Sequence, residues 1–513
     1  MALKLFNTLA RSAQDFSPLD AAGKTVGMYC CGPTVYDFAH IGNWRTFVFA
    51  DLVRRYLEFK GYAVNHVMNI TDVEDKIIKR VRENKTTLRE FTGKYEAAFL
   101  DDLRALGCRE PHHKPRATEY IAEIIALIEK LIARGIAYQA ADDSVYFSIT
   151  KYQGCGCNYG QLLKLNFDEM RAGERVASDE YEKESVADFA LWKARVPDDG
   201  DVFWPSPFGE GRPGWHIECS AMSMKVLGES FDLHLGGEDL KFPHHEDEIA
   251  QSEGATGKPF VKHWLHGAHL LVEGKKMSKS LGNYFTLRDL VAKGFTGREV
   301  RYLLLTAHYR ETFNFTLEGL VGARAALGRI NECVGKLRDI GRDALPRIQA
   351  DQQVGPTNLV EQFAAALDDD LNISAAWGAV FDWVRETNRK LAANTVNTES
   401  AALALADWAK VDAVLGVGKL LTITGSAHMV LSAATLSATG TVTGVAAKAM
   451  VGNVTVVTSE GETIPAEIVA LLEARQASRQ AKDFKRSDAL RDELKAKGWT
   501  IEDSPKGPKL KKI

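Results

Sequence analysis

The stretch that decides the fold is MYCCGPTVYDFAHIGNWRT, from Met28 to Thr46. It begins inside an apolar run, Lys24–Cys31, which predicts a buried strand that a Gly-Pro turn ends. From His40 the apolar residues recur at helical spacing until Gly61. A second apolar run, Tyr62–Val73, predicts another strand. Strand, helix and strand without a hairpin signal indicate a right-handed parallel crossover.

Two adjacent cysteines, Cys30 and Cys31, stand at the end of the first predicted strand. Neighbours on a strand point to opposite faces, so the two thiols are not a redox pair. Ligands of parallel sheets bind beyond the carboxyl ends of the strands. Cys31 lies at such an end, as does the segment Asn69–Asp72 after the second strand. We therefore expect Cys31 to serve a binding site and Cys30 to fill the core.

The composition is that of an ordinary globular protein. The chain has 513 residues, 45% hydrophobic and 26% charged, and that length predicts about three domains. The net charge of −4 excludes a global basic signature, so any site for a polyanion must be local. The seven scattered cysteines, without a signal sequence or an apolar run long enough for a membrane span, favour reduced thiols. We expect a monomeric, cytoplasmic protein without a membrane segment.

The word HIGN, from His40 to Asn43, opens the predicted helix. A helix N-terminus offers free N–H groups and a positive dipole end to a phosphate. Gly42 allows a close approach to the backbone, and the side chains of His40 and Asn43 can donate hydrogen bonds. The same word also fits a capped helix start with a surface histidine.

A basic loop, GKKMSKSLGN, follows at Gly274–Asn283 and places several ammonium groups beside hydroxyls and glycines. Such a loop suits a leaving pyrophosphate, whose charge grows in the transition state. The alternative is a solvated basic turn. Between the two motifs, LGGEDL contains Gly237 and Asp239, and the Asp239 carboxylate suits either a ribose hydroxyl or a helix N-cap.

Two further segments hold candidate metal ligands. GWHIEC ends in Cys219, and FPHHEDE contains His244 and Glu248, which share a helix face at i and i+4. With Cys31 they offer two sulfur, one nitrogen and one oxygen atom, a set that favours zinc over magnesium or calcium. The spacing leaves alternatives open: an acidic helix cap with a surface histidine pair, a buried Cys219 that only packs, or His245 with Glu248 at i and i+3.

Several long words occur in one order: CGPTVYD with HIGN, NITDVEDK, GRPGWHIECSAM, FPHHEDEIAQSE and KMSKSLGN. Together they resemble the cysteinyl-tRNA synthetase family of class I aminoacyl-tRNA synthetases. HIGN and KMSKS are similar to the two signature motifs of that class, with Asn43 at a position where His is more familiar. The resemblance spans Leu3–Asn314, and the last predicted helix, Asp483–Gly498, resembles the family's C-terminal end.

The resemblance implies a role for each matching residue. It implies metal ligands at Cys31, Cys219, His244 and Glu248; catalytic groups at His40, Asn43, Lys276 and Lys279; ATP contacts at Thr34, His40, Gly42, Asn43, Gly237, Asp239 and Lys279; and contacts to a substrate cysteine at Gly32, Thr34, Thr71 and Trp215. It implies one zinc ion per chain and magnesium that accompanies ATP, with tRNA(Cys), ATP and L-cysteine as partners.

The expected fold is α/β: a Rossmann-type parallel-sheet catalytic domain with an inserted connective domain, followed by a mainly α-helical C-terminal region. The expected parts are the first catalytic half (1–114), the connective insertion (115–213), the second catalytic half with the KMSKS loop (214–294), a stem-contact and helical bundle region (295–414), an atypical Thr-, Val- and Gly-rich insert (415–465), and a basic C-terminal helix and tail on the anticodon side of the tRNA (466–513).

The expected activity is ATP-dependent activation of cysteine to cysteinyl-adenylate and transfer to the 3′ end of tRNA(Cys), with zinc selecting the substrate thiol. A cysteine–amino-sugar ligase of the mycothiol type is one alternative, because its catalytic half is similar. A catalytically inactive RNA-binding paralogue is another, although His40, KMSKS and all candidate ligands are present. The long chain beyond KMSKS and its basic end favour the tRNA ligase.

Overall fold

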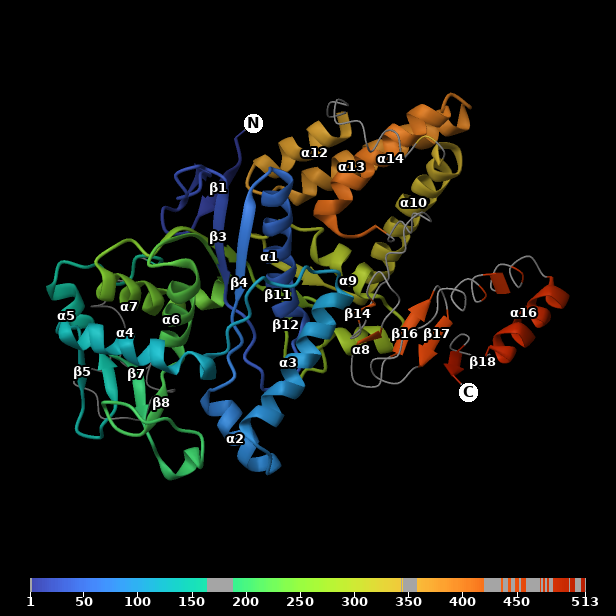
Figure 1. The fold of residues 1–513 in the computed structure, drawn as a ribbon. Helices are drawn as coiled ribbons and strands as arrows, with labels where there is room; N and C mark the ends of the chain where they lie inside the picture. Colours follow the sequence, from blue (N-terminus) through green and yellow to red (C-terminus); the bar gives the residue numbers. More distant parts are fainter. Residues whose placement is uncertain are drawn as a thin grey trace. The chain divides into compact units, whose positions relative to one another are not determined.

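The computed structural model describes residues 2–163, 188–342 and 358–418, with Ala344 and short segments between 435 and 512 (Figure 1). The chain divides into two units, Met1–Lys419 and Leu420–Ile513. In the described residues, no helix has the length and apolar character needed to cross a membrane.

A four-stranded parallel sheet forms the centre of the first unit, in the order β10-β9-β3-β4. Its strands are β3 (Thr25–Cys30), β4 (Ala63–Met68), β9 (Phe231–Gly237) and β10 (Val261–Gly267). Helix α1 (Ile41–Phe59) connects β3 to β4, which confirms the crossover that the sequence predicts. Because all four strands run in one direction, the residues that follow them meet at one edge of the sheet.

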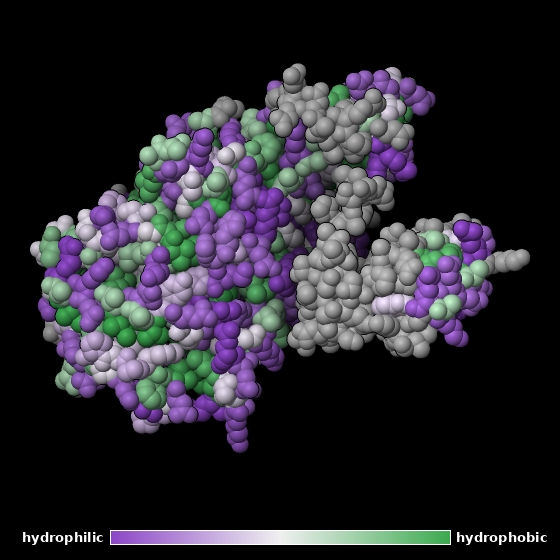
Figure 2. Space-filling model, viewed as in Figure 1, coloured by the Kyte–Doolittle hydropathy of each residue, from purple (hydrophilic) through white to green (hydrophobic). Residues whose placement is uncertain are grey.

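A second sheet is inserted between β4 and β9. It is antiparallel, in the order β5-β6-β7-β8, and has its own apolar core with α4. The elements of this section are α2 (Asp75–Asn84), α3 (Leu88–Ala105), α4 (Ile121–Ala133), β5 (Ala137–Gln139), β6 (Val145–Phe147), α5 (Ile149–Gly154), β7 (Phe189–Ala194), β8 (Gly211–Pro213) and α6 (Trp215–Leu227). In Figure 2, hydrophilic residues dominate the visible face over α2 and α3, as amphipathic surface helices require.

Short strands and helices complete the first unit. A hairpin of β1 (Lys4–Asn7) and β2 (Ser12–Asp15) precedes the sheet, and α7 (Glu246–Thr256) leads into β10. After β10 follow β11 (Leu270–Val272), β12 (Lys275–Lys276), α8 (Leu287–Ala292), α9 (Gly297–Leu304), β13 (Phe313–Phe315), α10 (Leu317–Gly341), α12 (Asn358–Asp368), α13 (Ile373–Ala392) and α14 (Thr398–Leu415). The region after β13 is therefore helical, as expected, with α10 packed on α14 and α12 on α13.

The described segments of the second unit are mainly strands. They are β14 (Thr435–Leu436), β15 (Val442–Thr443), β16 (Lys448–Val451), β17 (Val454–Val457), α16 (Phe484–Ala496), β18 (Trp499–Glu502) and β19 (Lys509–Lys512). Strand β19 pairs with both β17 and β18, so part of the predicted basic tail is a sheet strand. Strands β14 to β17 lie in the segment expected as a Thr-, Val- and Gly-rich insert, while residues 419–434 and 458–470 lie outside the described residues.

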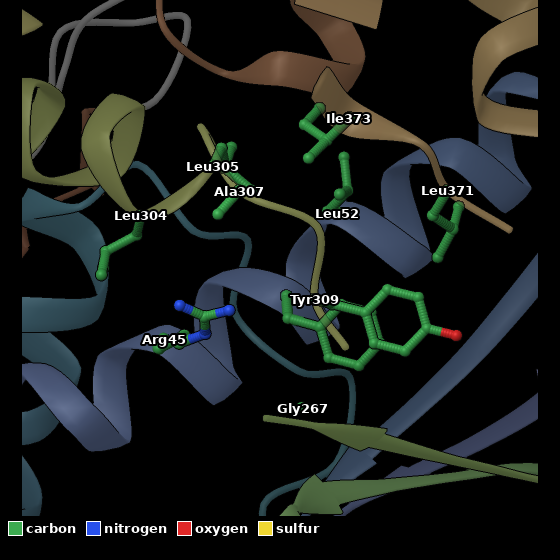
Figure 3. A pocket seen from close by; sticks show the side chains of 10 residues that line it. Arg45, Leu52, Gly267, Leu304, Leu305, Ala307, Tyr309, Leu371 and Ile373 are labelled. Atoms are coloured by element: carbon green, nitrogen blue, oxygen red, sulfur yellow. The ribbon is translucent and has the colours of Figure 1, made fainter. Parts of the chain in front are cut away.

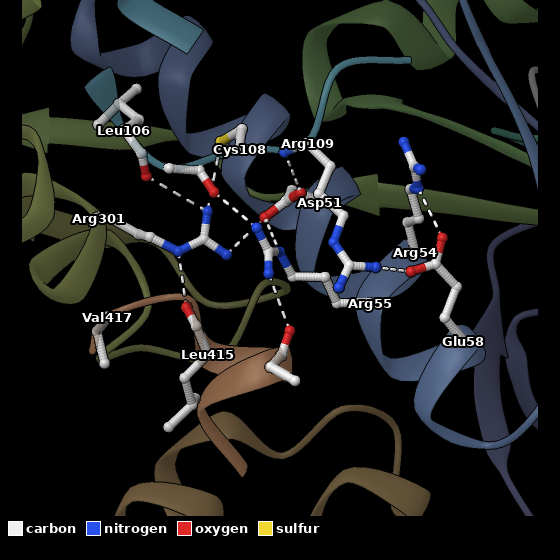
Figure 4. Close-up of polar contacts among 12 residues, drawn as sticks. Asp51, Arg54, Arg55, Glu58, Leu106, Cys108, Arg109, Arg301, Leu415 and Val417 are labelled. Atoms are coloured by element: carbon white, nitrogen blue, oxygen red, sulfur yellow. Dashed lines mark hydrogen bonds and ion pairs between the residues drawn. The ribbon is translucent and has the colours of Figure 1, made fainter. Parts of the chain in front are cut away.

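A buried ion cluster joins helix α1 to the helical region (Figure 4). The guanidinium of Arg301, which is fully buried, contacts Asp51 of α1 at 2.5 Å and donates to the carbonyl of Leu415 at 2.7 Å. Arg55 contacts the same carboxylate at 2.7 Å and donates to the carbonyl of Ala413 at 2.9 Å. Although burial opposes the charge, Arg301 and Arg55 lower the pKa of Asp51. The last turn of α14 is thus tied to α1.

A small cavity lies where α1 meets β10 and the segment after α9 (Figure 3). Arg45, Leu52 and Tyr309 are among its lining residues, and its volume is about 10 Å³. That volume is about the size of one water molecule, so the cavity is too small for a substrate.

The ion cluster yields a stability prediction. Replacing one member of a buried pair leaves the other charge poorly compensated, which costs about 3–5 kcal/mol. We expect Arg301→Met to lower the free energy of unfolding of the first unit by about 3 kcal/mol, the lower end of this range, because Arg55 still contacts Asp51. The midpoint of thermal unfolding measures the effect. Arg385→Met is the matched control, because its pair with Asp382 is exposed on both sides and is worth about 0–1 kcal/mol. Equal shifts for the two variants would contradict the prediction.

Candidate active site and metal centre

Four buried ligand groups converge beyond the end of β3. The ligand atoms of Cys31, Cys219, His244 and Glu248 all lie within 4.8 Å of one another. Cys31 follows β3, Cys219 lies on α6, and Glu248 lies on the first turn of α7. The two sulfur atoms are 3.9 Å apart, and His244 Nε2 is 3.1 Å from Glu248 Oε1. Cys30, in contrast, belongs to the main apolar core. The set predicted from the sequence is brought together, and its donor atoms suit a metal ion such as zinc.

The turn before α7 differs from the sequence prediction. The sequence predicts a helix that starts directly after Pro243, whereas α7 begins at Glu246. The residues Lys241–His245 form a wider turn that contains Phe242 in an extended conformation. His244 therefore precedes the helix, although its ring still contacts Glu248.

Protons and charges are strongly coupled within this cluster. A hydrogen bond from Cys31 lowers the pKa of Cys219 to about 6, and burial raises the pKa of Cys31 well above its ordinary value. Against the effect of burial, hydrogen bonds to Cys219 and Glu248 raise the pKa of His244 to about 10. Burial also opposes the charge of Glu248, but His234 and His244 lower its pKa to about 2. Shared protons of this kind are what a divalent cation displaces when it binds thiols and imidazoles.

A second arrangement of ligands overlaps the first. The ligand atoms of Cys31, His234, His245 and Glu248 also lie within 4.8 Å of one another, which keeps the His245 alternative in view. His245 Nδ1 is engaged by His266 Nε2 at 2.8 Å, and His234 Nε2 contacts Glu248 Oε2 at 3.0 Å. Only the first set contains two thiols, so we favour it for zinc. His234 contacts Glu248, and His245 Nε2 is 3.4 Å from Cys31 Sγ, so both rings are placed to orient members of the first set.

The sequence reasoning missed this layer of histidines. His234 and His266 lie on the apolar strands β9 and β10 and are buried. A buried histidine inside an apolar strand needs a hydrogen-bond partner, so its presence in the sequence could have indicated a polar cluster there. Its partner could not be assigned from the sequence, because the contacts join separate segments.

The HIGN segment forms a reciprocal cap at the start of α1. His40 Nδ1 accepts the backbone N–H of Asn43 at 3.2 Å, and Asn43 Oδ1 accepts the backbone N–H of His40 at 3.1 Å. Burial lowers the pKa of His40, which favours the neutral ring. Because Nδ1 accepts, the neutral ring carries its hydrogen on Nε2 and can donate it to an anion. The capped helix start and the phosphate site are therefore compatible.

The KMSKS loop is attached to the HIGN segment. The backbone N–H of Ile41 donates to the carbonyl of Phe285 at 3.0 Å, and the ring of Tyr284 lies edge-on to His40. Within the loop, Asn283 Oδ1 accepts the backbone N–H of Ser278 at 2.8 Å. A Cβ atom at Gly42 would lie only 3.0 Å from the His40 ring, so the absence of a side chain at Gly42 leaves room for this ring. The two motifs thus form one surface.

The two lysines of the KMSKS motif, Lys276 and Lys279, differ in their contacts. Lys279 Nζ contacts Asp37 Oδ2 at 2.9 Å and lies over the ring of Tyr284. Although burial opposes the charge, Lys279 lowers the pKa of Asp37. Lys276, on β12, is exposed. Asp37 and Tyr284 are site residues that the sequence reasoning did not select.

The residues expected to contact the substrate amino acid are Gly32, Thr34, Thr71 and Trp215. The backbone N–H of Gly32 donates to Asn69 Oδ1 at 2.8 Å, and a Cβ at Gly32 would lie 1.7 Å from the Asn69 carbonyl oxygen, so only glycine fits. Thr34 and Thr71 form a bridge beyond the ends of β3 and β4. The ring of Trp215 is 38% exposed and packs on that of His244, with centroids 4.4 Å apart.

Gly237 is the last residue of β9, and Asp239 follows directly after the strand. Gly237 precedes a short 3-10 turn, Glu238–Leu240, and Asp239 is inside that turn, so it is not a helix N-cap. A Cβ at Gly237 would lie 2.3 Å from Asp239 Oδ1. Burial lowers the pKa of His40, and the charge of Asp239 partly offsets this decrease. The carboxylate therefore lies within electrostatic reach of the HIGN segment.

Comparisons with known proteins agree with this site. Residues 17–325 match the family described as tRNA synthetases class I (C) catalytic domain. Residues 362–419 match the DALR domain, and residues 462–508 match the cysteinyl-tRNA ligase anticodon binding domain. The cysteine–tRNA ligase of Chlamydia muridarum is 45% identical over 100% of both chains. That of Protochlamydia amoebophila is 43% identical over 99% of this chain and 98% of its own.

The chain belongs to the cysteinyl-tRNA ligase family. It is accordingly a ligase of the aminoacyl-tRNA synthetase class. Solved structures show the same fold: two structures of Mycobacterium tuberculosis methionyl-tRNA synthetase with methionyl-adenylate align with TM-scores of 0.53 and 0.54. Their sequence identities are 15% and 14%, and each alignment covers 76% of this chain and 89% or 90% of the other.

The cysteinyl-tRNA ligase site predicts different roles for its two adjacent cysteines. We expect zinc in this cluster. We therefore expect a lower zinc content in Cys31→Ala, which removes one sulfur of the cluster, than in Cys30→Ala, because Cys30 packs in the core. Elemental analysis of the purified chains gives the zinc content per chain. A zinc-free Cys30→Ala beside a zinc-loaded Cys31→Ala would overturn the assignment.

Proposed function

We propose that the protein activates L-cysteine with ATP and transfers the cysteinyl group to the 3′ end of tRNA(Cys). One observation supports this most: two thiols, an imidazole and a carboxylate meet in a buried cluster. That cluster and the start of α1, where a phosphate can bind, both lie beyond the carboxyl end of β3. A thiol-binding cluster at the sheet edge that carries a phosphate site is the combination that cysteine activation needs.

The cluster selects the substrate by its thiol. Cys31, Cys219, His244 and Glu248 would hold zinc, which supplies a Lewis acid that binds the substrate sulfur as thiolate. Packing alone distinguishes side chains that differ by one small group by only about 1–3 kcal/mol. A hydroxyl is neither soft nor acidic enough for this binding, so serine is rejected before activation.

The activation step needs positioning more than proton transfer. The substrate carboxylate is already a nucleophile at neutral pH, so no general base is required. His40 Nε2 and the backbone N–H of Gly42 bind the phosphates, with Thr34 and Asn43 beside them, because the N–H groups of Ile41 and Asn43 already have acceptors in the protein. Lys276 and Lys279 stabilise the charge that grows on the pyrophosphate, and magnesium accompanies ATP. Gly237 and Asp239 face the ribose, and Gly32, Thr71 and Trp215 enclose the amino acid.

The helical and C-terminal regions are assigned to the tRNA. The match of residues 462–508 to an anticodon binding domain supports this assignment, and the local lysines suit phosphate contacts. The domain boundaries given above, and the monomeric and cytoplasmic state, stay predictions. The amino-sugar ligase is less favoured, because an enzyme of that kind has less need of an anticodon-side domain.

Cysteine-dependent exchange of pyrophosphate into ATP tests the cluster. We expect exchange with cysteine, none with serine, and loss of exchange and zinc in Cys219→Ser, because a hydroxyl replaces one ligand sulfur. Cys333→Ser is the matched control, because Cys333 is equally buried but lies in the main core. If Cys219→Ser exchanged pyrophosphate as fast as the wild type, the assignment of Cys219 as a zinc ligand would be contradicted.

The acceptor is tested separately. We expect transfer of labelled cysteine to tRNA(Cys), since the chain carries an anticodon-binding match. Glucosaminyl-inositol is offered under the same conditions as the competing acceptor. Transfer to the amino sugar without transfer to tRNA would replace the proposal by the rival ligase.

The contact between Lys279 and Asp37 predicts an effect on ATP affinity. Both side chains are partly exposed, and such a pair is worth about 0.2–1 kcal/mol. We expect Asp37→Asn to free Lys279 for the phosphates and to tighten ATP binding by about twofold to fivefold, the equivalent of that energy. Equilibrium binding of ATP measures it, with Asp382→Asn as the control for an exposed pair elsewhere. Weaker binding by Asp37→Asn would show that Asp37 orients the lysine instead.

A further inference from the structure

A polar cavity adjoins the metal cluster. It has a volume of about 110 Å³, and Glu74, Asp75, Lys193, Arg212, Trp215 and Glu218 are among the residues that line it. We call it the Glu218 cavity. Its walls come from the segment after β4, from the inserted strands β7 and β8, and from the first turn of α6. Of these residues, the proposed mechanism uses Trp215 alone and gives no role to Glu218.

Glu218 is the unusual group in the wall. Its side chain is 1% exposed, and its Oε2 has no hydrogen-bond partner among the described residues. An unpaired polar atom in the interior costs free energy, so a native structure that keeps one has a reason for it. A carboxylate that lines a cavity and lacks a partner is suited to accept hydrogen bonds from a bound donor.

The charges of the cavity favour a cation. Lys193 Nζ contacts Asp75 at 3.0 Å, and the Arg212 guanidinium is shared between Asp75 and Asp199. The two cations of the wall are therefore matched by two carboxylates. Glu218 and Glu74 are two further acidic side chains of this wall, and a bound cation favours the ionised form of such carboxyl groups. An anionic ligand gains little in this cavity, whereas an ammonium group gains a charged hydrogen bond.

The cavity is also in the right place for one part of the substrate. Glu218 is the neighbour of Cys219 on α6, and the ring of Trp215 borders the cavity while it packs on His244. Cysteine carries its thiol, ammonium and carboxylate on a three-carbon frame, so the three groups point in different directions. The thiol is directed to the metal cluster and the carboxylate to ATP, which leaves the ammonium to face a third wall.

We propose that Glu218 receives the α-ammonium group of the substrate and makes the site selective for an amino acid over other thiols. This inference rests on the proposed function, because it needs the thiol at the cluster. A site built to bind a charged donor rejects an analogue that lacks it, since the buried acceptor is then left unpaired. Glu218 is thus a specificity-determining residue for the amino group, while the cluster selects the sulfur.

Three small thiols separate these roles in a binding experiment with the full-length, zinc-loaded protein. L-Cysteine has all three groups, cysteamine lacks the carboxylate, and 3-mercaptopropionate lacks the ammonium. Calorimetry gives the dissociation constant of each for the wild type and for Glu218→Gln. We expect the variant to bind cysteine and cysteamine about 10- to 100-fold more weakly, the range of a hydrogen bond to a charged group, and 3-mercaptopropionate with unchanged affinity.

Two controls keep the test decisive. Zinc content and the midpoint of thermal unfolding establish that each variant is folded. If Glu218→Gln does not fold, Glu218→Asp takes its place, because it keeps the carboxyl group but shortens the side chain by one methylene. We expect it to weaken the same two thiols, cysteine and cysteamine. Glu74→Gln removes a carboxylate from the same wall and is expected to change cysteamine binding by less than about threefold, because Glu74 also faces Lys76.

The outcomes are distinguishable. Equal weakening of all three thiols by Glu218→Gln, no weakening of any, or a larger effect of Glu74→Gln overturns the role of Glu218. A wild-type protein that binds 3-mercaptopropionate more tightly than cysteamine also overturns it. Failure of the zinc-loaded wild type to bind cysteine at all contradicts the proposed function itself.

Discussion

Two thiols, an imidazole and a carboxylate confined to one buried volume form the constraint on which the catalytic end of the sheet depends. The most exposed of the four, Cys31, is only 7% exposed, and all four ligand atoms lie within 4.8 Å of one another. Such groups are costly to remove from water unless opposite charge and hydrogen bonds compensate them. The four come from the end of β3, from α6 and from the turn and first residues of α7. Whatever compensates them therefore also holds these segments against one another.

A different set of contacts fixes helix α1, at whose start we propose that the nucleotide binds. Helix α1 is fixed at its start by the reciprocal cap of His40 and Asn43. In its middle it is fixed by Asp51, whose Oδ2 contacts both Arg301 and Arg55. A rigid helix matters for the proposed function, because its start, where we propose that the phosphates bind, must keep its distance from the cluster. The carbonyls of the last α14 turn take part in the same clamp, so the helical region that follows the catalytic halves contributes to the position of α1.

How much could be predicted from the sequence depends on whether the signal is local. The crossover of β3, α1 and β4, and the place of Cys31 at a strand end, follow from periodicity and a turn within one short stretch. The choice between His244 and His245 could not be made, because i+3 and i+4 lie on the same helix face, and His244 in fact precedes the helix. Contacts such as Lys279 with Asp37, 242 residues apart, have no local signal. The same holds for Lys509–Lys512, which was expected as a tail and pairs as a strand with segments far from it in the sequence.

The candidate site contains buried contacts, which are costly to break, and exposed contacts, which are not. The groups assigned to the thiol and the ammonium are buried, and neither of these substrate groups is transformed during activation. The contact that faces the phosphates is exposed: the Lys279 side chain is 64% exposed and Asp37 24%. A buried ion pair resists rearrangement because breaking it strands a charge, whereas an exposed pair breaks at little cost. In the proposed activation step, the negative charge of the attacking carboxylate passes through the α-phosphate to the leaving pyrophosphate, so an exposed contact is suited to the phosphate side. Recognition is thus assigned to the rigid side of the cavity and charge stabilisation to the side that can move.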